Sequence, residues 1–110
     1  MSAAVHNLSG WVGTTLSRRV VLTNPKTGLA FDLTGWTVRG QLRAIDTDAL
    51  AIDLEITLGA QGEFVFAVPA TAVLIPSVTP NYYYDVEITK GVEAYVVVFG
   101  RAMFALNATR

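Results

Sequence analysis

The residues that could perform chemistry in this 110-residue chain are few and widely separated. His6 is its only histidine and cysteine is absent, so neither a Cys/His metal site nor a Ser-His-Asp triad has the side chains it needs. Asp46-Thr47-Asp48 has the alternating carboxylates of a calcium loop, but not the later glycine and closing glutamate. We therefore expect no enzyme activity, no metal and no cofactor. His6 is interpreted as a bystander, and the Asp-Thr-Asp segment as a solvated turn.

Three consecutive tyrosines, Tyr82-Tyr83-Tyr84, resemble the start of a stacking platform for a glycan or a base. Successive residues of a β-strand point to opposite faces, so Tyr83 should face away from the other two. A flat platform of three rings cannot form in that geometry. We expect a core tyrosine whose hydroxyl reaches the surface instead.

Composition limits the partners of the chain. The net charge is −1, from 8 basic and 9 acidic residues, which gives no electrostatic footprint for nucleic acid or an anionic membrane. No apolar run approaches the roughly 20 residues of a membrane helix. The first six residues lack the regions of a signal peptide, so we expect synthesis in a cytoplasm. Charged residues make up 15% and apolar residues 52%, which favours a surface covered by protein partners.

Runs in which apolar and polar residues alternate, closed by Gly, Pro, Asn or Asp, predict β-strands throughout the chain. We expect seven strands in one domain, residues 1–110, and a helical turn at Pro69–Ile75 that crosses between sheets. The expected strands are Ala4–Leu8, Thr14–Thr23, Trp36–Ile45, Ala51–Leu58, Glu63–Val68, Tyr82–Thr89 and, after a turn at Lys90-Gly91-Val92-Glu93, a last strand from Ala94 to about Leu106.

Short strands with frequent turns indicate an all-β fold, a single antiparallel β-sandwich of immunoglobulin-like type. A closed barrel is the alternative. The shared period of two directs one set of side chains inward. This set comprises Trp36, Val38, Leu42, Ile52, Leu54, Phe64, Phe66, Tyr84, Val86 and Ile88.

Charged positions in this pattern make two further predictions. In an immunoglobulin-like sandwich the third and sixth strands are neighbours, so Arg39 and Arg43 should lie beside Asp85 and Glu87 on one exposed sheet face. Arg18-Arg19 occupies both faces of the second strand, so one guanidinium must meet the edge of the core or a partner.

The last strand is apolar on both faces. Extended, about thirteen residues would span roughly 43 Å, longer than we expect a small sandwich to cover. Either a bulge or bend at Gly100 switches the buried face between the two halves of the strand, or a neighbouring subunit covers one face or the far end; the two interpretations are compatible. The candidate interface residues are Tyr95, Val97, Phe99, Met103 and Phe104.

Three segments carry a family resemblance. They are Thr23-Asn24-Pro25-Lys26-Thr27-Gly28 leading into Phe31-Asp32-Leu33-Thr34-Gly35-Trp36-Thr37-Val38-Arg39, then Tyr82-Tyr83-Tyr84-Asp85-Val86-Glu87-Ile88, then a closing Ala108-Thr109-Arg110. From about Leu16 onward, the chain resembles small structural proteins of tailed phages and prophages. It is also similar to the N-terminal domain of phage baseplate upper proteins.

This resemblance implies a non-enzymatic virion component that acts by protein–protein packing. A tail-tip or baseplate adaptor is the first interpretation, and a capsid decoration (cement) protein on the head surface is the second. A glycan-binding module or an inhibitor of a host protein is a lesser alternative. The implied partners are tail, baseplate or major capsid proteins, with further copies of the chain itself. The implied location is the virion, after synthesis in the bacterial host cytoplasm.

Overall fold

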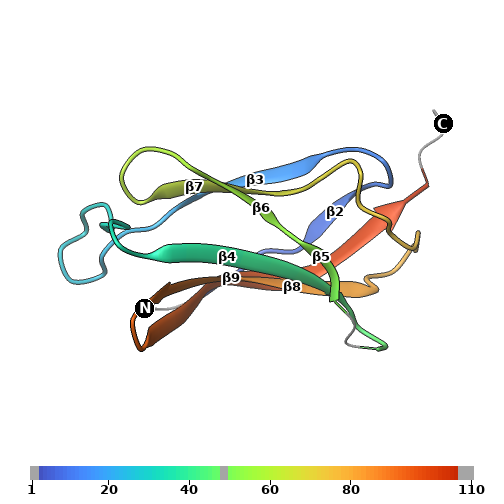
Figure 1. Ribbon diagram of the computed structural model, residues 1–110. Helices are drawn as coiled ribbons and strands as arrows, with labels where there is room; N and C mark the ends of the chain where they lie inside the picture. The colour runs from blue at the N-terminus through green and yellow to red at the C-terminus, as the bar shows by residue number, and fades with distance from the viewer. Residues whose placement is uncertain (1–2, 48–49, 107–110) are drawn as a thin grey trace.

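The computed structural model describes residues 3–47 and 50–106, and it consists of two facing β-sheets (Figure 1). The closing Ala108-Thr109-Arg110 and Asp48 of the Asp-Thr-Asp turn lie outside the described residues. The strands are β1 (Ala4–Val5), β2 (Leu8–Trp11), β3 (Leu16–Val21), β4 (Thr37–Ala44), β5 (Leu50–Asp53), β6 (Glu55–Leu58), β7 (Glu63–Val68), β8 (Tyr82–Lys90) and β9 (Glu93–Ala105).

The strand order is that of an immunoglobulin-like sandwich. One sheet has the order β1-β9-β8-β4-β5, with β2 also paired to β9, and the other has the order β3-β7-β6. These correspond to the GFCC′ and BED sheets of immunoglobulin domains. The hydroxyl of Tyr82, at the start of β8, accepts a hydrogen bond from the Ile75 N–H at 2.7 Å, as a tyrosine corner does at this place in the fold. The predicted all-β, immunoglobulin-like sandwich is confirmed, and two separate sheets replace the closed-barrel alternative.

Several element boundaries differ from the prediction. The first segment forms two short strands, and both run parallel to β9. The expected strand Ala51–Leu58 divides at Leu54, where the chain passes from one sheet to the other and Leu54 N–H donates to Gly40 C=O at 2.9 Å. The helical turn expected at Pro69–Ile75 is wrong: this segment contains a single turn closed by Ala72 N–H and Pro69 C=O, without a helix.

The core lies between the sheets, and the predicted inward set occupies it. Seven of its ten members are buried, namely Leu42, Leu54, Phe64, Phe66, Tyr84, Val86 and Ile88. Trp36, Val38 and Ile52 are partly buried and pack against them. At one end, Phe31 and Trp36 make an edge-to-face contact with 5.6 Å between ring centroids. The alternation read from the sequence therefore identifies the core face of four strands.

The turn before β4 orients Trp36 toward that end. Asp32 Oδ1 accepts the N–H of Thr34 at 3.0 Å, and Gly35 adopts φ 82°. A positive φ favours glycine because it has no Cβ to clash. Hydrogen bonds from Thr34 also hold the pKa of Asp32 below its ordinary value. The segment needs no ligand to explain its residues.

A β-bulge explains why β9 is apolar on both faces. The pairing with β8 passes from Val98 opposite Val86 to Val96 opposite Glu87, which leaves Val97 as the extra residue. Val97 and Val98 are consecutive and both buried. The face switch therefore occurs three residues before Gly100, the position expected from the sequence. The domain's longest extent is 46 Å, so the sandwich carries all 13 residues of β9, contrary to our expectation.

Gly100 leaves room for the backbone of the N-terminal segment. It lies opposite Tyr84 in the β8–β9 ladder, and the backbone carbonyl of His6 packs directly against its Cα. That carbonyl accepts a hydrogen bond from the Tyr84 hydroxyl. His6 N–H donates to Phe99 C=O at 2.9 Å, and Asn7 Oδ1 accepts Arg101 N–H at 3.0 Å. The break between β1 and β2 is thus fixed to β9 on both sides of Gly100.

Replacing Gly100 with alanine should destabilise the domain, because an added Cβ would overlap the His6 carbonyl. We expect Gly100→Ala to lower the free energy of unfolding by about 1–3 kcal/mol. Gly10→Ala in β2 is the matched control, since its Cβ would meet the Leu16 side chain at 3.4 Å, and its cost should stay below about 1 kcal/mol. Urea unfolding of both variants measures the difference. Equal stabilities would contradict this account of Gly100.

The Tyr84 hydroxyl should make stability depend on pH in the alkaline range. Burial raises the pKa of Tyr84 from 10.0 to about 12, with the positive charge of Arg18 acting in the opposite direction. A phenol whose folded pKa is raised stabilises the fold below the unfolded pKa and loses that contribution between pH 10 and about 12. We expect the stability difference between wild type and Tyr84→Phe to shrink across this range. Urea unfolding at pH 8, 10 and 12 measures it, and a constant difference would contradict the prediction.

Candidate protein-interaction surface

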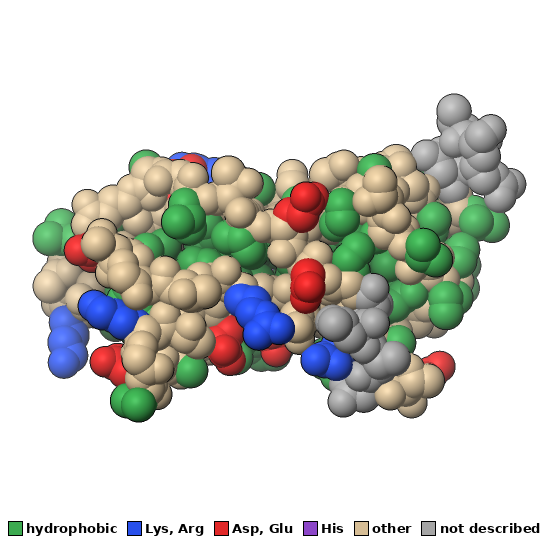
Figure 2. Space-filling model, in the orientation of Figure 1, with side chains coloured by type: hydrophobic (Ala, Val, Ile, Leu, Met, Phe, Trp, Pro, Cys, Tyr) green, Lys and Arg blue, Asp and Glu red, His purple; other side chains and the backbone are tan. Residues whose placement is uncertain are grey.

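The outer face of the larger sheet carries charges of both signs. Strands β4 and β8 are antiparallel neighbours, and their register places Arg39 opposite Glu87 and Gln41 opposite Asp85. These residues line a shallow hollow of about 280 Å³ together with Arg43. The predicted neighbourhood of Arg39 and Arg43 with Asp85 and Glu87 is confirmed. Figure 2 shows basic and acidic side chains intermixed along the lower layer, with hydrophobic side chains reaching the surface between the layers.

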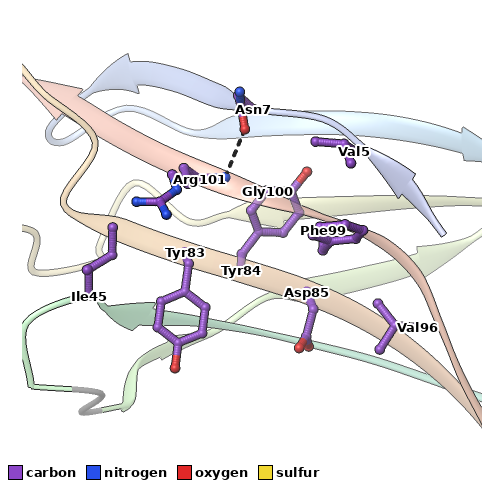
Figure 3. Close-up of a pocket in the computed structure, with 10 residues that line it drawn as sticks. All are labelled: Val5, Asn7, Ile45, Tyr83, Tyr84, Asp85, Val96, Phe99, Gly100 and Arg101. Atoms are coloured by element: carbon purple, nitrogen blue, oxygen red, sulfur yellow. Dashed lines mark hydrogen bonds between the residues drawn. The ribbon is translucent and has the colours of Figure 1, made fainter.

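A larger hollow, of about 670 Å³, lies beside these charges on β8 and β9. Tyr83 and Asp85 point to one side of β8, and Tyr84 points to the other (Figure 3). Tyr83 is partly buried, whereas Tyr82 and Tyr84 are buried, so the alternation predicted for the three tyrosines is confirmed. Arg101 lies opposite Tyr83 in the ladder. The hollow therefore combines a phenol, a carboxylate and a guanidinium on one sheet face.

The five candidate interface residues divide into three groups. Val97 and Phe104 are 2% and 1% exposed, so they belong to the core of this chain, and their prediction as interface residues is wrong. The bulge at Val97 turns that side chain inward, and Phe104 lies on the inward face after it. Phe99 is 41% exposed and Met103 is partly buried. Tyr95 is 37% exposed but rests on Trp36, with 5.9 Å between ring centroids, so it closes one end of the sandwich.

The exposed apolar residues continue beyond those that the sequence singled out. Val5 lies opposite Phe99 in the β1–β9 pairing, and Val96 lies on the same outer face opposite Glu87. Further along β9, Trp11 pairs with Ala105 and reaches the surface. We call these residues the outer β9 strip: Val5, Trp11, Val96, Phe99 and Met103. Val5 and Trp11 were missed because their strands pair in parallel with β9, and no local pattern in the sequence indicates that pairing.

The structure does not bring together the residues that could perform chemistry, within the part of the chain that it describes. The side chain of His6 is exposed, whereas its backbone N–H and C=O make hydrogen bonds with Phe99 C=O and the Tyr84 hydroxyl. Within residues 3–47 and 50–106, no three His, Cys, Asp or Glu side chains gather in a way that could hold a metal ion. The same residues form no helix with the length and apolar character needed to cross a membrane.

Comparison with known proteins finds matches among solved structures. No family model and no curated protein matches the chain. Among solved structures, the chain is similar to an extracellular fragment, including the stalk region, of novel immune-type receptor 11 from Ictalurus punctatus. That match covers 100% of this chain and 89% of the other, with 9% identity and a TM-score of 0.41. The immunoglobulin-like assignment stands on the strand order and register given above.

A lysine placed at neighbouring positions of β9 should separate core from surface. Val97→Lys puts a charge into the sandwich, and we expect it to cost at least about 3 kcal/mol or to prevent folding. Phe99→Lys lies on the outer face, and we expect a loss below about 1 kcal/mol. Thr37→Lys, exposed on β4 of the same sheet, is the control for added charge. Circular dichroism and urea unfolding measure the three variants; an unfolded Phe99→Lys would contradict the assignment of the outer face.

Proposed function

We propose that this chain is a non-enzymatic structural module that works by packing its larger sheet against another protein. The outer β9 strip carries this proposal. It places Val5, Trp11 and Phe99, which are 66%, 55% and 41% exposed, on or beside one long strand. Exposed apolar patches of this kind, bordered by polar residues, mark protein interfaces in soluble proteins.

The geometry of the strip suits a flat partner. The strip extends along β9, and the charges of Arg39, Asp85 and Glu87 border it on the neighbouring strands. A specific interface needs about 800 Å² per partner, which one sheet face with its flanking loops can provide. In such an interface the apolar centre supplies most of the affinity, and the charged rim supplies orientation.

We infer that the partner belongs to a tailed-phage virion, most specifically to the tail tip or baseplate. The support for this placement is the sequence resemblance carried by the Asn24–Gly28 turn, the Asp32-Leu33-Thr34-Gly35 turn and the Tyr82–Ile88 strand. Capsid decoration is the alternative, because a cement protein would use the same kind of apolar sheet face against the major capsid protein. Copies of the chain itself are further candidate partners.

Mass spectrometry of a phage that encodes this chain tests the placement. We expect the protein in isolated tails and its absence from purified empty heads; its presence in heads would favour the decoration role, and its absence from both would contradict a virion role. Incorporation of Phe99→Lys tests the strip. We expect this folded variant to be lost from virions while Thr37→Lys is retained, and equal incorporation would contradict packing through the strip.

A glycan-binding role is the second candidate, and one observation favours it. The 670 Å³ hollow places the Tyr83 ring beside Asp85 and Arg101, a combination of aromatic face and polar groups that can hold a sugar. Binding of the isolated domain to a glycan array, lost in Tyr83→Ala, would support this role. An array without any binder would leave protein packing as the function of this face.

A further inference from the structure

Among the described residues, no strand pairs with the edge of β3 that faces away from β7. Strand β3 pairs with β7 in the smaller sheet, and the other sheet begins beyond it with β1. Leu22 N–H donates to Gly62 C=O at 2.7 Å. Leu22 and every second residue before it therefore direct their N–H and C=O groups toward β7. By the antiparallel pairing rule, the N–H and C=O groups of Ser17, Arg19 and Val21 point away from β7. They present a row of donors and acceptors to an incoming strand.

A slot of about 490 Å³ lies along this edge, between β3 and β1. Its apolar lining comes from both sheets and includes Val20 and Leu22, with Phe66, Val97 and Val98 of the core. The charged side chains in its described lining are Arg18 and Arg19, and no Asp or Glu is among them. The slot is therefore apolar in its depth and basic at its β3 side.

The two arginines differ in what they contact. Arg19 points outward and makes a bidentate ion pair with Glu63, with Nε–Oε1 at 2.6 Å and Nη2–Oε2 at 2.9 Å. That pair lowers the pKa of Glu63, mainly through the hydrogen bond. Arg18 lies on the inward face of the strand, and its guanidinium donates to the Ser17 C=O of its own strand at 2.8 Å. Arg18 is therefore the arginine that the sequence analysis expected at the edge of the core. Its guanidinium occupies the Ser17 C=O, one of the hydrogen-bond acceptors on the open edge of β3.

We propose that this slot binds an extended segment of a partner protein as an added strand on β3, with a carboxylate opposite Arg18 and apolar residues at the other positions that face the slot. A carboxylate of the incoming strand takes the Arg18 guanidinium, which releases Ser17 C=O for backbone pairing. The apolar residues of the segment enter the slot above Val97 and Val98. An added strand of six residues, about 20 Å long, matches the length of β3. This inference is independent of the virion assignment, because it uses a different edge of the sandwich.

Charge argues against a second copy of β3 as the occupant. The two antiparallel registers that pair β3 with its own copy over most of its length place either Arg18 opposite Arg18 or Arg19 opposite Arg19. Like charges directly opposite each other destabilise a strand pair. The two arginines therefore discourage self-pairing, and Arg18 favours a partner strand that carries a carboxylate opposite it.

The test uses the full chain, labelled with ¹⁵N, and a capped six-residue peptide that places one glutamate and two valines on one face of the strand and threonines on the other. A second peptide has glutamine in place of glutamate. We expect the glutamate peptide to bind, to slow hydrogen exchange at the amides of Ser17, Arg19 and Val21, and to bind at least about fivefold more tightly than the glutamine peptide. In Arg18→Gln the two peptides should bind equally. Arg19→Gln is the matched control and should keep the preference for glutamate.

The remaining outcomes are decisive as well. Three results would each overturn the proposal. The two peptides could bind wild type equally, the preference for glutamate could survive Arg18→Gln, or the peptide could protect amides on β5 or β6. Protection of the β3 amides without peptide, rising with protein concentration, would assign the slot to a second copy and also overturn it. If Arg18→Gln does not fold, the salt dependence in wild type decides. The fivefold preference should then vanish at about 1 M salt, and a preference that persists counts against the proposal.

Discussion

The hydroxyl of Tyr84 needs a hydrogen-bond partner inside the sandwich, because a buried polar group without one costs about 1–3 kcal/mol. The backbone carbonyl of His6 accepts this hydrogen bond, and several other features of the fold depend on the contact. The carbonyl can come close only because Gly100 has no side chain. The N-terminal segment then breaks into β1 and β2 on either side of the contact, both paired with β9. On its other side the Tyr84 ring stacks on Phe66, with 5.4 Å between centroids, which joins the two sheets without a disulfide.

That arrangement has a consequence for the smaller sheet. Because the N-terminal strands are held on β9, they are not available to pair with β3, and the edge of β3 stays open beside the core. An open edge next to apolar residues invites unwanted pairing. Arg18 counters this by placing a charged side chain on the inward face of the edge strand and by bonding to Ser17 C=O. In the proposed complex the Arg18 guanidinium also favours a partner strand with a carboxylate. One side chain therefore opposes unwanted strand pairing and selects the partner.

The sequence was sufficient for the features that depend on alternation within one strand. The inward set, the opposite faces of Tyr83 and Tyr84, and the neighbourhood of Arg39 with Glu87 all follow from a period of two and a common topology. It failed where two distant segments set the geometry. The bulge at Val97 depends on how β9 matches β8, and the division at Leu54 depends on the room that Gly40 leaves above β4. No local pattern records either constraint. The same limit explains the inclusion of Val97 and Phe104 among the expected interface residues.

The bulge also determines which apolar residues of β9 face outward. In a strand of 13 residues without a bulge, Val97 and Val98 would point to opposite faces, so one of the two would leave the core. With the bulge, both valines are buried, and Val96 and Phe99 share the outer face on either side of them. The low charge content therefore does not produce a uniformly apolar surface. It produces a strip along β9 bordered by the charges of β4 and β8, and this is the arrangement on which the proposed function rests.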